Sequence, residues 1–209
     1  MSELLPEEQV TVDTYNAVAD IWNEEQDNRG FWDNEMQRFH QLLPAGKVLE
    51  IGSGGVRDAK AMIELGYDYT GTDVSEKLIE ALRAKLPPDT KLYHQSVYGL
   101  EFPDDPKFDG FWAAAVLLHV PKSRIDEALS RIRSVVKPGA LGFISVKDGV
   151  GEGMVSENWG DEVHDRFIAL YSQPEFQDKL TSNGFTAIEH SLRTFQEESR
   201  WHCFFVRAA

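Results

Sequence analysis

Between residues 47 and 147 the sequence alternates short apolar runs with segments of helical periodicity. The apolar runs have the length of strands and cover residues 47–51, 69–73, 91–97, 108–116 and 141–147. The helical segments between them cover residues 57–65, 75–85 and 123–136. Strands separated by helices of this length pair in parallel, and helices cover both faces of the sheet. The sequence therefore predicts an α/β, doubly wound fold with a mostly parallel sheet.

Helical segments precede this core. Four apolar residues of the segment 13–25 recur at i, i+3, i+4 and i+7: Tyr15, Val18, Ala19 and Trp22. This spacing predicts an amphipathic helix with one buried stripe. A second helix is expected over residues 33–43, since a proline and a glycine follow it. We expect residues 1–43 to form a helical cap beside the core at 47–147.

The segment that follows the core is rich in glycine from Gly149 to Gly160. A connection of this length is typical of a lid or a mobile loop, so residues 148–171 are expected to border a binding pocket. Residues 172–209 then carry a helix with capping-box spacing at Ser172 and Glu175. Two apolar runs end the chain, and the segment between them is too short for a crossover helix, which predicts an antiparallel pair.

Composition and charge narrow the function classes. The 209 residues fit a single domain, and 35 acidic against 21 basic residues give a formal charge of −14. This charge repels a phosphate backbone, so nucleic acid is an unfavourable partner. No leader-like segment and no apolar stretch of membrane length is present, which disfavours a membrane partner. The single cysteine, Cys203, excludes an internal disulfide and fits a reducing, cytoplasmic setting.

The segment 48–58 carries the clearest binding signal. A predicted strand runs into Gly52, Gly54 and Gly55, and a helix follows. Glycines at such a turn let the backbone bend sharply and let a ligand approach closely. Asp73 stands 21 residues after Gly52 at the end of the next strand, near the spacing at which a carboxylate reaches ribose hydroxyls. Arg57 replaces the last glycine of the dinucleotide pattern, which argues against a bound pyrophosphate.

These residues resemble the class I S-adenosylmethionine-dependent methyltransferases. The acid-x-Gly-x-Gly strand and loop of that family match Glu50, Gly52, Ser53, Gly54 and Gly55, and Asp73 matches the ribose-binding acid of its second motif. Residues 108–120 resemble the fourth-strand segment of the family, and residues 131–147 resemble the helix, turn and strand that follow. The likeness spans residues 15–206 in element order. It implies a seven-stranded Rossmann-like sheet with a C-terminal antiparallel strand and with N-terminal helices that cap the site.

The resemblance also implies a set of cofactor-binding residues and no metal site. They are Tyr15, Glu50, Gly52, Ser53, Gly54, Gly55, Arg57, Asp73, Val74, Ser96, Val97, Ala113 and Ala114. Two positions depart from the family pattern. Val56 stands where a third glycine is common, which requires a negative φ there. Ser96 stands where an Asp often binds the adenine amino group, so its hydroxyl or a backbone carbonyl has to accept that hydrogen bond.

The expected function is methyl transfer from S-adenosylmethionine to a small-molecule acceptor, with S-adenosylhomocysteine as the product. Such a displacement needs alignment more than acid or base catalysis. His119, past the predicted fourth strand, is the candidate base, and its alternative role is to cap or pack the following helix. Arg57 either pairs with the cofactor carboxylate or is solvated. Tyr15 and Trp22 either close the cofactor pocket or belong to the core.

The acceptor pocket is expected to be bordered by residues 147–153, with Arg200 and Trp201 as further candidates. Two other functions stay open at this point. A nicotinamide-dependent oxidoreductase shares the sheet and the ribose acid. A non-catalytic module that binds S-adenosylmethionine shares the whole cofactor site.

Overall fold

The computed structural model describes residues 3–25, 31–102, 107–195 and 199–209. Residues 26–30, inside the predicted helical cap, lie outside the described part. Within it, seven strands form one sheet in the order β3-β2-β1-β4-β5-β9-β8, and β6 with β7 forms a separate two-stranded sheet. The strand bounds are β1 (Lys47–Ile51), β2 (Asp68–Asp73), β3 (Lys91–His94), β4 (Phe108–Ala113), β5 (Val136–Lys147), β6 (Glu152–Trp159), β7 (Glu162–Ala169), β8 (Phe185–Phe195) and β9 (Ser199–Ala208).

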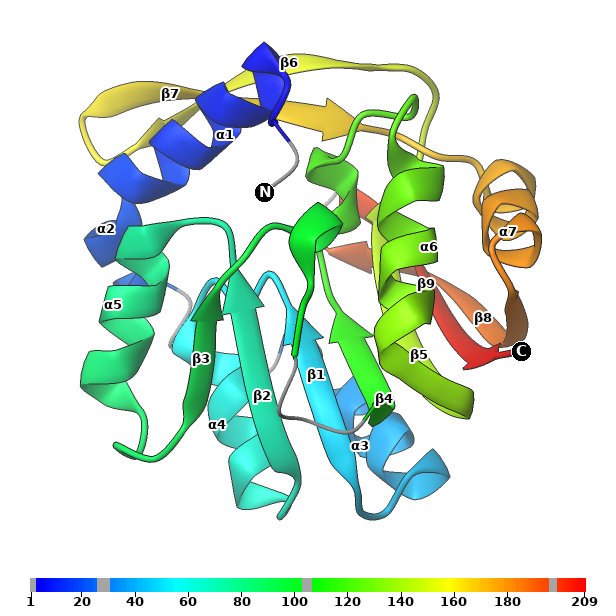
Figure 1. Cartoon of the computed structure of the whole chain (residues 1–209). Coiled ribbons are helices and arrows are strands. Elements are labelled where there is room, and N and C mark those ends of the chain that lie inside the picture. The colour runs from blue at the N-terminus through cyan, green and yellow to red at the C-terminus, as the bar shows by residue number, and fades with distance from the viewer. Residues whose placement is uncertain (1–2, 26–30, 103–106, 196–198) are drawn as a thin grey trace.

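The pairing within the large sheet confirms the predicted architecture. Strands β1 to β5 pair in parallel, while β9 lies antiparallel to both β5 and β8 (Figure 1). All five residues of β1 are buried, as expected for a central strand that helices cover on both faces. The sheet is therefore the doubly wound, Rossmann-like sheet with a C-terminal antiparallel strand.

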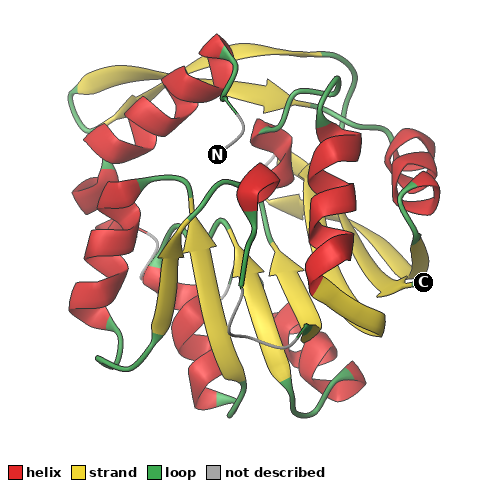
Figure 2. Ribbon diagram, in the orientation of Figure 1, coloured by secondary structure: helices red, strands yellow, loops and turns green. Residues whose placement is uncertain are grey.

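Helices pack on both faces of this sheet (Figure 2). Their bounds are α1 (Pro6–Ala17), α2 (Ala19–Glu25), α3 (Asp33–Leu42), α4 (Val56–Glu64), α5 (Glu76–Lys85), α6 (Ile125–Val135) and α7 (Gln173–Ser182). Apolar side chains of α3, α4 and α5 form one core cluster with the sheet, and those of α6 and α7 form the other. Among the described residues, no helix has the length and apolar character to span a membrane.

Local signals place several helix ends where the sequence predicts them. The Ser75 hydroxyl accepts a hydrogen bond from the Leu78 backbone N–H at 3.2 Å and begins α5. The Ser172 hydroxyl accepts one from the Glu175 N–H at 3.4 Å and begins α7. Caps of this kind depend only on neighbouring residues, which makes them readable from sequence.

The predicted helix over residues 13–25 is two helices. α1 already begins at Pro6, where the Glu8 carboxylate accepts a hydrogen bond from the Leu5 N–H at 2.8 Å. α1 ends at Ala17, and α2 begins at Ala19; the residue between them, Val18, is buried and has non-helical backbone angles. The break lets the chain change direction, so that α1 contacts both β7 and α5, whereas α2 packs on α5. These tertiary contacts explain why the chain forms two helices although its apolar stripe predicts one.

The glycine-rich segment after the core is a β-hairpin and not an irregular loop. β6 and β7 pair antiparallel from Glu152↔Ala169 to Trp159↔Glu162. Gly160 and Asp161 form the turn between them, and Gly160 has φ +64°. The hairpin passes with α1 across the carboxyl ends of the parallel strands (Figure 1).

Three predicted strand bounds also change. β3 ends at His94 and β4 at Ala113, because the chain there turns into two short 3-10 helices, η1 (Val97–Gly99) and η2 (Leu117–His119). β5 begins at Val136, before the predicted Pro138-Gly139 turn, since Val136 pairs with Phe108 and an irregularity in register follows. The early strand ends open space at the carboxyl edge of the sheet, which is where open α/β sheets bind ligands.

Candidate active site

A cavity of about 480 Å³ lies at the carboxyl edge of the sheet. Its floor is formed by the ends of β1, β2, β4 and β5, and its cover is formed by α1 and the β6–β7 hairpin. This volume lies in the ordinary range for small-molecule sites. Of the predicted cofactor-binding residues, all but Ala113 line it: Tyr15, Glu50, Gly52, Ser53, Gly54, Gly55, Arg57, Asp73, Val74, Ser96, Val97 and Ala114.

The glycine loop depends on backbone angles and space that a side chain would disturb. Gly52 has φ +67° and Gly54 has φ +50°. A Cβ on Gly52 would lie 2.3 Å from Val116 Cγ2, closer than any real contact. The loop ends at Gly55, and Val56 is already the first residue of α4. Val56 therefore has helical backbone angles, as its lack of glycine freedom requires.

Asp73 joins the glycine loop to the end of β2. Its Oδ2 accepts a hydrogen bond from the Gly54 N–H at 2.9 Å, and its Oδ1 accepts one from the Ser75 N–H at 2.8 Å. Burial raises the pKa of the Asp73 carboxyl, and these backbone donors oppose that rise. Each oxygen keeps a lone pair, so the carboxylate can hold the loop and still accept hydrogen bonds from a ligand.

Glu50 belongs to a buried polar cluster under the loop. The Tyr69 hydroxyl donates to Glu50 Oε2, and the Ser53 hydroxyl lies 3.2 Å from the same Tyr69 oxygen. Burial, followed by the nearby Asp58 carboxylate, raises the pKa of Glu50 well above its ordinary value. An acid in such surroundings is stabilised by a positively charged or hydrogen-donating ligand.

Two side chains beside the loop, Arg57 and Trp22, indicate a ligand for different reasons. Arg57 lines the cavity, its Nε donates to Asp58 Oδ1 at 2.7 Å, and its guanidinium lies 5.6 Å from the Phe31 ring centroid. The Trp22 indole N–H is buried and has no hydrogen-bond partner among the described residues. An unpaired buried donor is costly, and a ligand acceptor in the cavity would satisfy it.

The far end of the cavity is formed by Ser96 and Val97, after β3. The Ser96 hydroxyl accepts a hydrogen bond from the Tyr98 N–H at 3.3 Å and keeps its own proton and a lone pair for a ligand. At the end of β4, Ala113 is completely buried in the core on the α6 side. Side chains alternate along a strand, so Ala113 faces away from the cavity and Ala114 lines it.

His119 lies beneath the cover and not against the following helix. Its Nδ1 lies 2.8 Å from the Phe167 carbonyl oxygen, and its Nε2 lies 3.0 Å from the Tyr15 hydroxyl. A carbonyl only accepts, so Nδ1 carries the proton and Nε2 accepts from Tyr15. Burial, and next the Arg166 charge, lower the pKa of His119 to about 4. The imidazole is therefore neutral near pH 7, with its basic nitrogen directed at Tyr15.

The hairpin adds three residues that sequence reasoning missed. Arg166 Nη1 donates to the Tyr15 hydroxyl at 2.9 Å, and its Nη2 pairs with Glu157 on the neighbouring strand. Trp159 packs near Tyr15 and Trp22, at centroid distances of 5.6 and 5.5 Å. The Gly160-Asp161 dipeptide was the available signal, because a two-residue loop of this type indicates a hairpin.

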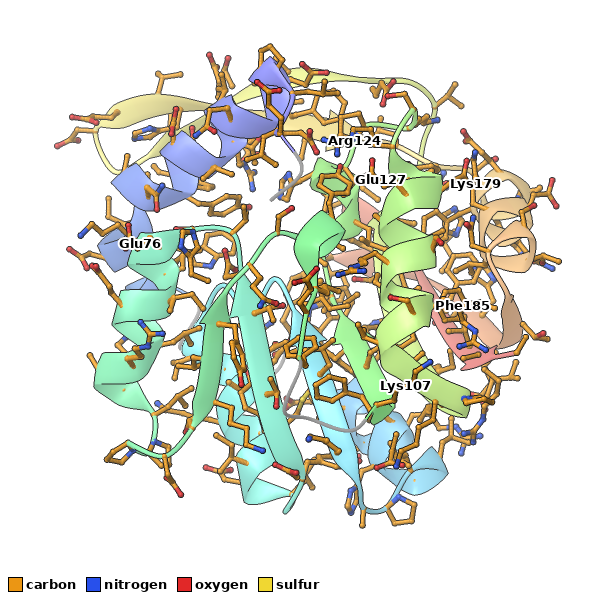
Figure 3. All side chains as sticks on the ribbon, viewed as in Figure 1. Glu76, Lys107, Arg124, Glu127, Lys179 and Phe185 are labelled. Carbon is orange, nitrogen blue, oxygen red and sulfur yellow. The ribbon has the colours of Figure 1, made fainter. Side chains whose placement is uncertain are left out.

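Hydrogen bonds to the hairpin and to Arg124 help to hold α1 and the residues before it over the cavity. The Thr14 hydroxyl donates to the Asp165 carbonyl at 2.7 Å, and the Phe167 N–H donates to the Thr11 hydroxyl at 2.9 Å. Arg124, at the start of α6, donates to the Glu8 carboxylate at 2.8 Å and to the Glu3 carbonyl at 3.1 Å (Figure 3). The cover is therefore attached to both the hairpin and α6.

The predicted acceptor border matches the cavity in two residues. Lys147 and Trp201 line it, whereas Arg200 pairs with Asp148 outside it. Lys147 and Trp201 are opposite each other in the β5–β9 register, which brings both side chains to the same face of the sheet. Trp32 and Ser199 line the same part of the cavity.

Ala115 has a left-handed backbone conformation that the sequence does not predict. It has φ +52°, in the left-handed region, and it is the one non-glycine residue of the described part with positive φ. Its N–H donates to the Ser145 hydroxyl at 2.8 Å. Residues held in this region often stand at functional sites, and Ala115 lines the cavity.

Comparison with known proteins agrees with this geometry. Residues 48–139 match the family model described as methyltransferase domain. The ubiquinone biosynthesis O-methyltransferase of Xanthomonas campestris pv. campestris (strain B100) is 32% identical over 160 residues, which cover 66% of this chain and 60% of that protein. A hybrid PKS-NRPS synthetase of Fusarium sp is 26% identical over 191 residues, or 82% of this chain. The chain spans only 5% of the length of that synthetase.

A solved structure shares the fold over the whole chain. The Burkholderia thailandensis 1,6-didemethyltoxoflavin-N1-methyltransferase, with bound 1,6-didemethyltoxoflavin and S-adenosylhomocysteine, superposes with a TM-score of 0.76 at 18% identity. The superposition covers 100% of this chain and 93% of that one. At this identity the likeness shows the fold. The glycine loop and Asp73 both lie within residues 48–139, the part of the chain that matches the methyltransferase domain.

Proposed function

We propose that this chain transfers a methyl group from S-adenosylmethionine to a small-molecule acceptor. One observation carries the proposal: the Asp73 carboxylate binds the Gly54 N–H of the glycine loop, and both residues line the same cavity. A nicotinamide-dependent oxidoreductase would share the acid, but Arg57 stands where its pyrophosphate loop needs glycine. The matched methyltransferase domain supports the same choice.

The residues around the loop suit this cofactor. In this proposal Asp73 accepts from the ribose hydroxyls, and Ser96 and Val97 border the adenine. Arg57 pairs with the carboxylate of the methionine part. The Trp22 indole N–H, unpaired within the described residues, finds an acceptor on the ligand. The glycines leave the room that the ligand occupies.

The cofactor supplies an already activated methyl group, so the chain mainly has to align the reactants and keep water out. Tyr15, Trp22 and Trp159 form an aromatic cluster with centroid distances of 5.3 to 5.6 Å. A positively charged sulfur near an aromatic face gains about 0.5–2 kcal/mol. The neutral state of His119 also leaves the sulfonium without a second positive charge from the imidazole.

We propose that His119 receives the proton when the acceptor has one to lose. Its Nε2 takes the Tyr15 hydroxyl proton while that hydroxyl takes the acceptor's proton, and the imidazolium then releases its proton to water. An imidazole with a pKa near 4 is a weak base, which limits this contribution. We expect His119→Asn to lower kcat by about 10²-fold without weakening S-adenosylhomocysteine binding. Equal kcat for the two proteins would remove His119 from the reaction.

A small acceptor and a cytoplasmic location are parts of this proposal. α1 and the hairpin cover the cavity, and they leave room for a small molecule more readily than for a folded substrate. The charge of −14 is unfavourable for acceptors made of nucleic acid.

The first test is calorimetric titration with S-adenosylmethionine, S-adenosylhomocysteine and NAD. We expect the two adenosyl compounds to bind and NAD not to bind. Asp73→Ala should lose at least about 1.5 kcal/mol of binding free energy, because it removes charged hydrogen bonds and releases the Gly54 N–H.

Asp109→Ala is the matched control for Asp73→Ala. Asp109 also accepts a backbone hydrogen bond, from the Lys47 N–H at 2.9 Å, but at the amino end of the sheet. The Asp109→Ala variant should therefore bind S-adenosylhomocysteine as tightly as the wild type. NAD binding alone would overturn the proposal, and equal S-adenosylhomocysteine affinity in Asp73→Ala would overturn the role of Asp73.

A further inference from the structure

Lys147 brings a positive charge to the part of the cavity that the cofactor proposal does not use. It is the last residue of β5, and its backbone is held by Tyr171, whose N–H donates to the Lys147 carbonyl at 3.0 Å. Its side chain is partly buried and lines the cavity. The glycine loop, Asp73 and Ser96 stand after β1, β2 and β3, whereas Lys147 ends β5, beyond β4 in the sheet.

The other cavity-lining cations already have carboxylate partners. Arg57 pairs with Asp58 at 2.7 Å, and Arg166 pairs with Glu157. For Lys147, no carboxylate lies within ion-pair distance in the part of the chain that the structure describes, and Asp148 next to it is engaged by Arg200 and His202. A partly buried ammonium without a partner favours an anionic ligand.

Two aromatic side chains line the same cavity as Lys147. Trp201 is opposite Lys147 in the strand register, and Trp32 lies 5.9 Å from Trp201 between ring centroids. Both indoles line the cavity and are almost fully buried. Flat rings beside one cation suit a planar aromatic molecule that carries a negative group.

We propose that the methyl acceptor is a small aromatic carboxylate, or an aromatic anion of similar size, whose negative group binds Lys147. This inference rests on the proposed function and names its substrate class. The protein as a whole carries a charge of −14 and repels anions, so Lys147 supplies the local attraction at the one place where the acceptor has to bind. Binding there places the remainder of the ring system between Trp201 and the His119–Tyr15 pair.

The experiment measures the preference for acids over amides. A panel of small aromatic carboxylic acids, each paired with its primary amide, is titrated by calorimetry into the full chain, with and without saturating S-adenosylhomocysteine. We expect acids of the panel to bind about tenfold tighter than their amides. Lys147→Met should abolish this ratio, and Lys147→Arg should restore part of it.

Lys107→Met is the matched control. Lys107 is an exposed lysine at the amino end of β4, the opposite edge of the sheet (Figure 3). Its replacement removes the same charge and should keep the acid preference. Equal binding of acids and amides across the panel would overturn the inference, and so would an acid preference that survives in Lys147→Met.

The affinity for S-adenosylhomocysteine separates the remaining outcomes. We expect Lys147→Met to leave this affinity unchanged. A weakened affinity would assign Lys147 to the cofactor carboxylate and overturn the acceptor site. A wild-type chain that binds no S-adenosylhomocysteine would instead overturn the proposed function, while the acid-to-amide ratio without cofactor would still decide the anion site.

Discussion

The two sides of the cavity are built in different ways. The cofactor side consists of strand ends and a glycine loop, and its main contacts are backbone N–H groups on one carboxylate, Asp73. The cover consists of α1 and the hairpin, and side chains from distant parts of the sequence hold it, such as Thr14 on the Asp165 carbonyl. A site fixed by backbone geometry is rigid and readable from local sequence. A cover fixed by side chains can change shape without disturbing the sheet.

The largest effect on stability is expected from Gly52→Ala, a substitution in the glycine loop on the cofactor side. The new Cβ would overlap the Val116 side chain, and the alanine backbone would have to adopt φ +67°. Backbone strain and overlap together should lower the free energy of unfolding by about 2–5 kcal/mol. Chemical denaturation measures the loss.

Gly66→Ala is the matched control for this change. Gly66 has φ +84°, but a Cβ there meets nothing within 4 Å. Gly66→Ala should lower the free energy of unfolding by about 1–2 kcal/mol, from backbone strain alone. Equal losses for the two variants would show that the Val116 contact does not matter.

The second-largest effect is the pH dependence of folding stability that His119, beneath the cover, produces. The pKa of His119 falls from its ordinary value of 6.5 to about 4 on folding. Between these values the unfolded chain binds a proton that the folded protein excludes, so stability is lost as the pH falls from 6.5 toward 4. This loss should reach on the order of 3 kcal/mol. Denaturation midpoints of wild type and His119→Asn across this range should converge at low pH, and parallel curves would contradict the buried neutral imidazole.

The smallest effect is expected from Thr14→Val, which loosens the cover alone. The variant keeps the shape of the side chain but leaves the Asp165 carbonyl without its donor, at a cost of about 1 kcal/mol. Amide hydrogen exchange should accelerate in α1 and β7 and stay unchanged in β1 and α4.

Thr181→Val in α7 is the control for Thr14→Val, because the Thr181 hydroxyl donates only within its own helix, to the Gln177 carbonyl at 3.0 Å. It should leave exchange in the cover unchanged. Faster exchange in β1 after Thr14→Val would mean that the two sides of the cavity open together.

The same difference explains how much the sequence could predict. Gly52, Asp73 and the Ser75 cap act through neighbours in the chain or at the adjacent strand end, so spacing alone located them. The break at Val18 could not be predicted, because it depends on α1 reaching β7. Arg166 was missed for the same reason: it meets Glu157 only once the hairpin has formed, and it meets Tyr15 only after the hairpin has packed on α1.

Ala115 shows a further limit. Nothing in Ala114-Ala115-Val116 signals a left-handed residue, which L-amino acids avoid at a cost of about 1–2 kcal/mol. The Ser145 hydroxyl, on the neighbouring strand, accepts the Ala115 N–H and helps to hold the conformation.

The anchoring of α1 also bears on how the protein is made. α1 is synthesised well before the groups that hold it, because the partners of Thr11 and Thr14 lie 156 and 151 residues later in the chain. During synthesis α1 has to wait until β7 has been made, and a helix of 12 residues is barely stable by itself in water. The parallel strands can pair earlier, so closure over the cavity is a late event in folding. A nascent chain can therefore pair its five parallel strands before its binding site has a cover.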